Sequence, residues 1–132
     1  MKGSYIIIAY IPEDKKIEIG KLGKIEFKHG YYAYVGSAMN SLEARIKRHL
    51  RKEKKMKWHI DFLLQHATIK KIFYKESLKK EECEIAKKFE GFEYIPKFGS
   101  SDCKCKSHLF YSDTINKIEN VVRKEMKEWN KD

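Results

Sequence analysis

The sequence has few of the residues that crosslink small extracellular proteins or interrupt regular structure. It contains three cysteines and two prolines in 132 residues. An odd number of cysteines argues against a disulfide framework, so we expect free thiols or metal ligands. No apolar run approaches the roughly 20 residues that a membrane-spanning helix requires. The N-terminus also lacks the apolar core of a signal peptide. These absences predict a soluble protein of the cytoplasm.

Acidic residues are outnumbered, because 19 Asp and Glu stand against 29 Lys and Arg, for a formal net charge of +10. A positive excess of this size favours a polyanionic partner. Since the membrane signals are missing, we expect nucleic acid, with DNA ahead of RNA. The length is that of one domain, and no repeat, low-complexity segment or linker divides it. We therefore expect residues 1–132 to form a single domain.

The N-terminal third predicts a small sheet. A continuous apolar run over residues 5–11 ends at Pro12 and is typical of a buried strand. Alternating isoleucine and charged residues over 17–27 indicate a hairpin, and the aromatic run over 31–35 indicates another strand.

The rest of the chain predicts helices alternating with short strands. Leu42, Ile46 and Leu50 recur at helical spacing behind Asn40, the expected N-cap. We expect one helix over about 41–53 and a second that begins near Trp58. A third should follow a cap at Ser77, and a last one, capped by Asp113, should carry an apolar face that ends at Trp129. Strands are expected at 68–74 and 109–111. The fold class is therefore α/β, of the α+β kind: a small central antiparallel or mixed sheet flanked by helices.

Two tripeptides and a helix carry a family resemblance. Gly3-Ser4-Tyr5 lies on the first predicted strand, Tyr34-Val35-Gly36 ends a later one, and Arg45 and His49 follow on the next helix. In this order they resemble the GIY-YIG nucleases. The resemblance implies a GIY-YIG endonuclease-like domain with Tyr5, Tyr34, Arg45 and His49 as catalytic residues. It also implies phosphodiester hydrolysis assisted by Mg²⁺, or Mn²⁺, held by one glutamate of a later helix.

These residue types suit that chemistry. A tyrosine hydroxyl can relay a proton from water, and a guanidinium neutralises charge on a phosphate. Each also has a plainer interpretation, because strand tyrosines are commonly core residues and arginines in Lys-rich helices are commonly solvated.

The metal-binding glutamate has to be chosen among Glu81, Glu82 and Glu84. Glu82 falls at helical spacing on an apolar stripe, where a carboxylate is costly unless a cation compensates it. The apolar residues that follow the glutamate in the family also match those after Glu82. We therefore expect Glu82 to bind the metal, with Glu84 as the alternative. The other members of the stripe are Leu78, Ile85 and Phe89.

Basic residues after the arginine of the motif form a predicted phosphate-tracking surface, which gives affinity without sequence information. The nucleic-acid-binding candidates are Arg48, Arg51, Lys52 and Lys55.

A second group of candidates lies in the C-terminal half. Cys103, Cys105 and His108 offer potential zinc ligands, and Cys83 could supply a fourth. Paired zinc cysteines usually have two or more residues between them, so the spacing favours a structural or phosphate-contacting loop over zinc. Further candidates are His59 and Asp61, which alternatively form a surface pair beside Trp58, and Ser101 and Asp102, which occupy the region of a family asparagine that has no clear equivalent here.

The sequence therefore predicts a divalent-metal-dependent endonuclease acting on DNA, with branched or damaged DNA in repair or recombination as candidate substrates. The alternative is a nucleic-acid-binding or interaction module of a repair complex that does not cleave.

Overall fold

The computed structural model describes residues 1–100 and 103–130. In this part of the chain the strands are β1 (Gly3–Ile11), β2 (Lys15–Glu18), β3 (Lys24–Phe27), β4 (Gly30–Ala38), β5 (Thr68–Glu76), β6 (Glu93–Tyr94), β7 (Leu109–Ser112) and β8 (Lys127–Glu128). The helices are α1 (Leu42–Leu50), α2 (His59–Leu63), α3 (Glu82–Lys87) and α4 (Ile115–Val122), with a 3-10 turn, η1, at Gly20–Leu22.

Six strands form an antiparallel sheet in the order β6-β7-β4-β1-β5-β8, and β2 with β3 forms a separate hairpin. The central strand, β1, pairs along its length with β4 and β5. Its side chains alternate between two hydrophobic clusters, with Tyr5 and Ile7 in one and Ile6 and Ile8 in the other. A strand buried on both faces needs a continuous apolar run, which is what the sequence supplies.

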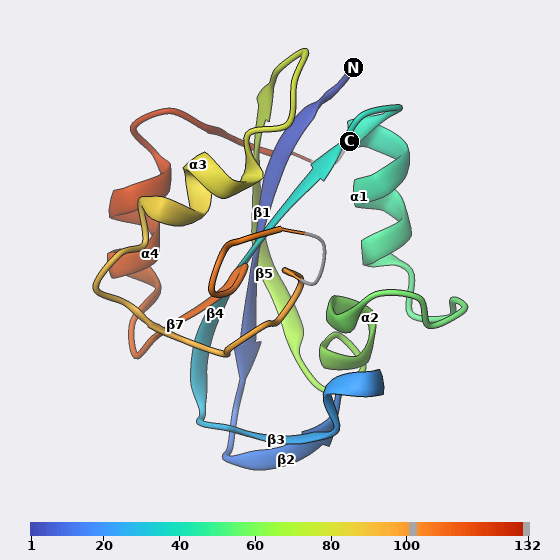
Figure 1. Cartoon of the computed structure of the whole chain (residues 1–132), viewed down its shortest axis with the longest axis vertical. Coiled ribbons are helices and arrows are strands. Elements are labelled where there is room, and N and C mark those ends of the chain that lie inside the picture. The colour runs from blue at the N-terminus through green and yellow to red at the C-terminus, as the bar shows by residue number, and fades with distance from the viewer. Residues whose placement is uncertain (101–102, 131–132) are drawn as a thin grey trace.

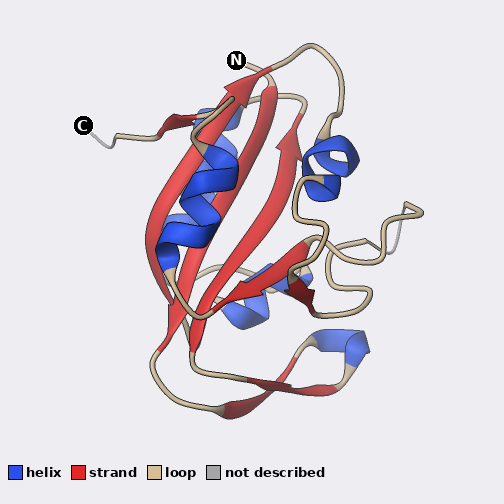
Figure 2. Cartoon of the chain, turned by 90° about the vertical axis from the view of Figure 1, so that its left-hand side faces the viewer, coloured by secondary structure: helices blue, strands red, loops and turns tan. Residues whose placement is uncertain are grey.

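Helices cover both faces of this sheet. Figure 1 shows α1 and α2 on one side of the strands and α3 and α4 on the other, and Figure 2 shows α4 lying across the long strands. Leu42 of α1 and Ile60 of α2 join the cluster of Tyr5. Ile85 of α3 and Ile118 of α4 join the cluster of Ile6. The arrangement is an α+β fold, which confirms the predicted fold class, and the pairing is antiparallel throughout the described sheet.

The N-caps predicted for three helices are wrong. Ser41, not Asn40, caps α1, and its hydroxyl accepts a hydrogen bond from the N–H of Ala44 at 3.1 Å. Ser77 does not cap α3, because its hydroxyl closes a local turn with Lys79 and the helix begins at Glu82.

The last helix is also shorter than predicted, and it begins after Thr114 rather than after an Asp113 cap. It ends at Val122, so Trp129 is not on it. The N–H of Trp129 donates to the carbonyl of Ile72 at 2.7 Å, beside the two-residue pairing of β8 with β5. Within the described residues no helix has both the length and the apolar character needed to cross a bilayer.

Candidate active site

The two tripeptide motifs meet across the sheet. Tyr5 pairs with Gly36 in the register of β1 and β4. A Cβ atom added to Gly36 would lie 2.5 Å from both Cζ and the hydroxyl oxygen of Tyr5. Carbon atoms do not approach so closely. Glycine at position 36 therefore makes room for the Tyr5 ring over the neighbouring strand.

The hydroxyl of Tyr5 lies 2.7 Å from Nε2 of His49 on α1. Both side chains are buried, with exposed fractions of 1% and 2%. Burial, aided by the positive charge of Lys54, lowers the pKa of His49 to about 3. Burial raises the pKa of Tyr5 to about 12, although the charge of Arg45 opposes this shift. At neutral pH a neutral phenol therefore faces a neutral imidazole.

Tyr34 stands beside this pair. Its ring centre lies 6.4 Å from that of Tyr5 and 6.3 Å from that of His49. Burial, and then the proximity of Tyr5, raise the pKa of Tyr34 well above the usual value for a phenol. Both motif tyrosines therefore keep their protons and act as hydroxyl groups at neutral pH.

Arg45 is held by two contacts. Its Nη1 donates to the carbonyl of Ser37 at 2.9 Å, and its guanidinium carbon lies 4.5 Å from the centre of the Trp58 ring. A guanidinium carries five N–H donors, and the planar group is oriented by one hydrogen bond and one cation–π contact. Arg45 also lines the cavity described below, so its remaining donors and its charge are available to a ligand there.

Glu82 opens α3 and lines the same site as Arg45. Its side chain is 25% exposed, and its Oε2 lies 4.0 Å from Nδ1 of His108. Glu84 is exposed to solvent. The apolar helix face from which Glu82 was predicted is partly wrong. Leu78, its first predicted member, is 90% exposed and lies before the helix begins. Glu82 itself faces a cavity rather than the apolar core.

That cavity has a volume of about 600 Å³. It brings together Tyr5, Tyr34, Arg45 and Glu82, whereas His49 lies behind Tyr5 and outside the lining. Two further cations also line it: Lys57, from the basic stretch after α1, and Lys80, which the sequence did not single out. The remaining side chains that bear polar or aromatic groups on the wall include Ser37, Asn40, Trp58, His59, Cys83, Cys103 and His108. Among these lining residues the cationic side chains outnumber the carboxylate, so the cavity attracts anions.

His59 belongs to this wall and has an assignable proton. Its Nδ1 accepts a hydrogen bond from the backbone N–H of Gly99 at 2.8 Å. Because a backbone N–H can only donate, Nδ1 is unprotonated. Burial lowers the pKa of His59, so the ring is neutral at pH 7 and carries its proton on Nε2, available as a donor.

Asp61 is not a surface residue. It is fully buried, and it accepts two hydrogen bonds from Arg48 at 2.9 Å each, as well as bonds from the N–H groups of Lys57 and Trp58. Burial opposes its ionisation, but the Arg48 and backbone hydrogen bonds outweigh burial and hold the pKa of Asp61 below its usual value. The Arg48–Asp61 pair therefore holds the start of α2, and with it the Trp58 ring that contacts Arg45.

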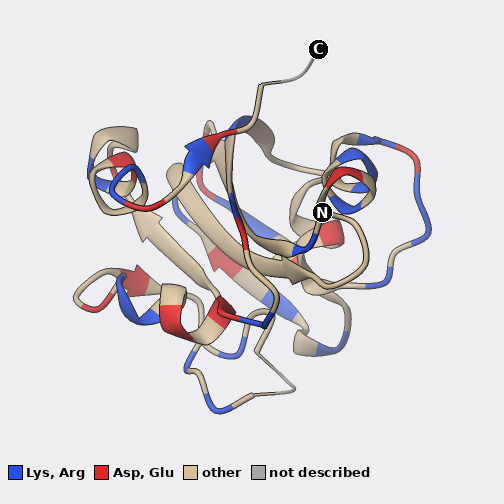
Figure 3. Cartoon of the chain, turned by 90° about the horizontal axis from the view of Figure 1, so that it is seen from above, with Lys and Arg blue, Asp and Glu red and all other residues tan. Residues whose placement is uncertain are grey.

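Arg48, which was predicted to contact phosphates, therefore has a structural role instead. Besides Asp61, it donates to the carbonyl of Lys55 at 3.0 Å. The other three predicted nucleic-acid contacts are exposed: Arg51, Lys52 and Lys55. Figure 3 shows Lys and Arg following the loop after α1.

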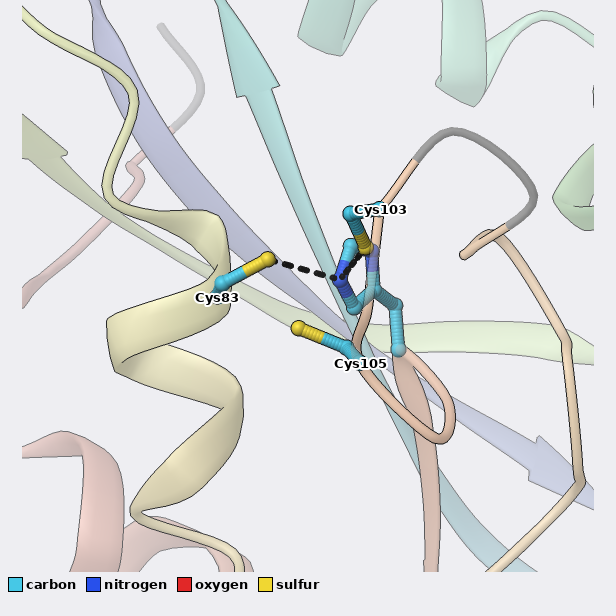
Figure 4. A group of neighbouring side chains, drawn as sticks. Cys83, Cys103 and Cys105 are labelled. Carbon is cyan, nitrogen blue, oxygen red and sulfur yellow. Dashed lines mark hydrogen bonds between the residues drawn. The ribbon is translucent and has the colours of Figure 1, made fainter.

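The cysteines gather at one point. The ligand atoms of Cys83, Cys103, Cys105 and His108 all lie within 4.8 Å of one another, a donor set that can hold a metal such as zinc. Figure 4 shows Cys83 reaching from α3 toward Cys103 and Cys105 on the loop. The preference for a loop without metal rested on the spacing of Cys103 and Cys105 alone, and it does not account for this cluster. Ser101 and Asp102 lie outside the described residues.

The fold and the cavity define an α+β protein with a phenol-, guanidinium- and carboxylate-lined site. The model of the family described as "Domain of unknown function DUF123" matches residues 4–131, and the chain belongs to this family. Comparisons with curated proteins and with solved structures gave no match. None of these comparisons links the chain to the GIY-YIG nucleases, so that resemblance stays a prediction.

Proposed function

We propose that this protein is a divalent-metal-dependent endonuclease that hydrolyses phosphodiester bonds in DNA. The observation that carries the proposal is the convergence of Tyr5, Tyr34, Arg45 and Glu82 on one cavity from four separate elements of the chain. Together they offer proton-transfer groups, a phosphate-binding cation and a carboxylate ligand. The motif order that resembles the GIY-YIG nucleases names Tyr5, Tyr34 and Arg45, and the residue pattern of the later helix selected Glu82.

One carboxylate in the cavity supports the choice of magnesium for this proposal. Mg²⁺ usually keeps several waters and binds through one or two carboxylates together with substrate phosphates. Glu82 is the one carboxylate among the described lining residues, and it is partly exposed. It would hold Mg²⁺ or Mn²⁺, which supplies Lewis-acid stabilisation of charge on the phosphate and on the leaving oxygen.

The cations of the cavity bind the scissile phosphate. Arg45 is oriented in advance by Ser37 and Trp58, so its donors need no reorganisation when charge develops on the phosphate. Lys57 and Lys80 line the same wall and add attraction for the flanking backbone. The Nε2–H of His59 adds a neutral donor.

Tyr5 and His49 position the attacking water. The Tyr5 oxygen accepts a hydrogen bond from the water, while its O–H donates to Nε2 of neutral His49 at 2.7 Å. Because burial lowers the pKa of His49 to about 3, the imidazole stays neutral, and it orients the Tyr5 phenol rather than storing a proton. Tyr34 keeps its proton and donates to a phosphate oxygen.

A cleavage assay tests the proposal. Labelled single-stranded, duplex and branched DNA, with matched RNA, is incubated with Mg²⁺, Mn²⁺ or a chelator. We expect cleavage of at least one DNA form that requires the ion and falls at least about a hundredfold in Arg45→Ala, since loss of a transition-state donor costs about this much. Glu84→Gln, an exposed change on the same helix as Glu82, is the control and should cleave normally. Cleavage that persists in the chelator contradicts the role of the metal.

A module that binds nucleic acid without cleaving it is the second candidate, favoured by the exposed basic loop after α1. Salt-sensitive binding to every member of the panel, with no cleavage under any metal, would support this candidate over the nuclease.

A further inference from the structure

Three cysteines and one histidine meet between α3 and the loop that precedes β7. Cys83 lies on α3, and the other three side chains follow 20 to 25 positions later in the chain. The Sγ atoms of Cys83 and Cys103 lie 3.8 Å and 3.5 Å from Nε2 of His108. All four ligand atoms lie within 4.8 Å of one another.

These separations match a tetrahedral zinc site. Zinc binds thiolate sulfur at about 2.3 Å and imidazole nitrogen at about 2.0 Å, so ligand atoms around one tetrahedral ion stand about 3.5 to 3.8 Å apart. The Cys83 and Cys103 distances to His108 already lie in that range, and the whole cluster needs only a small contraction. Three soft thiolates and an imidazole are a donor set typical of zinc.

The environment of His108 supports the same conclusion. Its side chain is 3% exposed, and its Nδ1 is buried without a hydrogen-bond partner among the described residues. A metal on Nε2 fixes the proton on Nδ1, which lies 4.0 Å from Oε2 of Glu82. Histidine ligands of zinc commonly donate their other N–H to a carboxylate; Glu82 lies near this nitrogen, but 4.0 Å is longer than a hydrogen bond, so zinc binding does not rest on Glu82.

We propose that Cys83, Cys103, Cys105 and His108 form a structural zinc site that fastens α3 to the loop before β7. Four protein ligands close the coordination sphere, as in structural rather than catalytic zinc sites. The ion joins a helix of six residues to a long irregular segment. It thereby fixes Glu82, the neighbour of Cys83, at the mouth of the cavity.

The charge around the site is favourable. Three thiolates and one Zn²⁺ leave one net negative charge. Lys87, Lys104 and Lys106, together with one carboxylate, Glu90, line the groove that Cys83 and Cys105 also line. Cationic side chains near an anionic cluster stabilise it. The zinc proposal is independent of the proposed nuclease activity, because neither the four ligands nor the charge balance of the site requires bound nucleic acid.

Metal content of the protein purified without chelator tests the site directly. We expect about one zinc per chain by plasma mass spectrometry, and three thiols that react with a thiol reagent only after the zinc is released. Replacement by Co²⁺ should give the intense visible bands of tetrahedral cobalt thiolate. Zinc well below one per chain, in a folded protein whose thiols react at once, overturns the proposal. So does a Co²⁺ spectrum typical of an octahedral site.

Variants separate this cluster from adventitious metal. We compare the zinc that stays bound to each variant after passage over a chelating column. Cys105→Ser should keep at least tenfold less zinc than the unmodified chain, because the site is left with three protein ligands. His29→Ala removes an exposed histidine paired with Asp14 and is the matched control, with zinc content unchanged. Equal zinc loss in both variants contradicts the assignment. Where Cys105→Ser fails to fold, the Co²⁺ spectrum of the unmodified chain decides.

Discussion

Adding one methyl group at Gly36 should displace the phenol of Tyr5. The Cβ of an alanine there would lie 2.5 Å from Cζ and from the hydroxyl oxygen of Tyr5, about 0.9 Å closer than ordinary van der Waals separation. Tyr5 is buried and cannot swing into solvent. Gly36→Ala therefore has to push the ring away from β4 and stretch the 2.7 Å distance from its hydroxyl to His49.

The size of the effect follows from two opposing contributions. Overpacking a well-filled core costs about 1 to 3 kcal/mol, while alanine in place of glycine recovers about 0.5 to 1 kcal/mol of unfolded-chain entropy. We expect a net destabilisation of about 1.5 kcal/mol, measured by urea unfolding with circular dichroism. Under the proposed function, a displacement near 1 Å should also slow cleavage about a hundredfold.

A double-mutant cycle isolates the cause. Tyr5→Leu removes the ring atoms that crowd the new Cβ, so Gly36→Ala made on that background should cost less than about 0.5 kcal/mol. The coupling energy between the two sites is then about 1 kcal/mol, as for residues that touch directly. An equal cost of Gly36→Ala on both backgrounds would refute the steric argument.

Three further predictions concern charge. Asp61→Asn should lower the free energy of unfolding, measured in urea, by about 3 kcal/mol, because it breaks a buried pair with Arg48. Asp113→Asn, which breaks an exposed pair with Lys117, is the control and should leave stability nearly unchanged. The pKa of His49 is lower in the folded chain, about 3, than in the unfolded one. The unfolded chain therefore takes up a proton first, and His49 should reduce stability by up to about 1.4 kcal/mol per pH unit as pH falls from about 6.5 to 3. His49→Gln should remove that slope and the exposed His66→Gln should not; identical pH profiles for His49→Gln and the wild type would contradict the burial argument. Replacing Arg51 and Lys55 together by alanine should reduce the slope of the logarithm of the DNA-binding constant against the logarithm of salt concentration, by about 0.9 for each phosphate that is no longer neutralised. An unchanged slope would show that neither residue contacts DNA.

The sheet and its motif pair were predictable from local patterns. The Ile-rich run of β1 and the aromatic run of β4 each carry a strong strand signal, and the hairpin between them follows from alternating residues around Gly20 and Gly23. The meeting of Tyr5 with Gly36 was not visible in either motif alone, because it depends on the register of two strands.

Other features depended on packing that the sequence does not display. The start of α3 was misplaced because Leu78 continues a helical stripe in sequence but is exposed in space. The burial of Asp61 depends on the return of Arg48 across a loop. The metal cluster was ranked below a loop without metal because one residue separates Cys103 from Cys105; this spacing does not show how closely Cys83, the fourth candidate ligand, approaches from another element.

The central claim is that Glu82 holds a catalytic divalent ion in the cavity. The ratio of single-turnover cleavage rates of the wild type and Glu82→Gln, on the best DNA substrate at saturating Mg²⁺, tests it most directly, with zinc content measured on both to show that the fold of α3 is kept. We predict a ratio of about a hundred or more, with zinc unchanged. A ratio near one, in two proteins that both cleave, would contradict the role of Glu82.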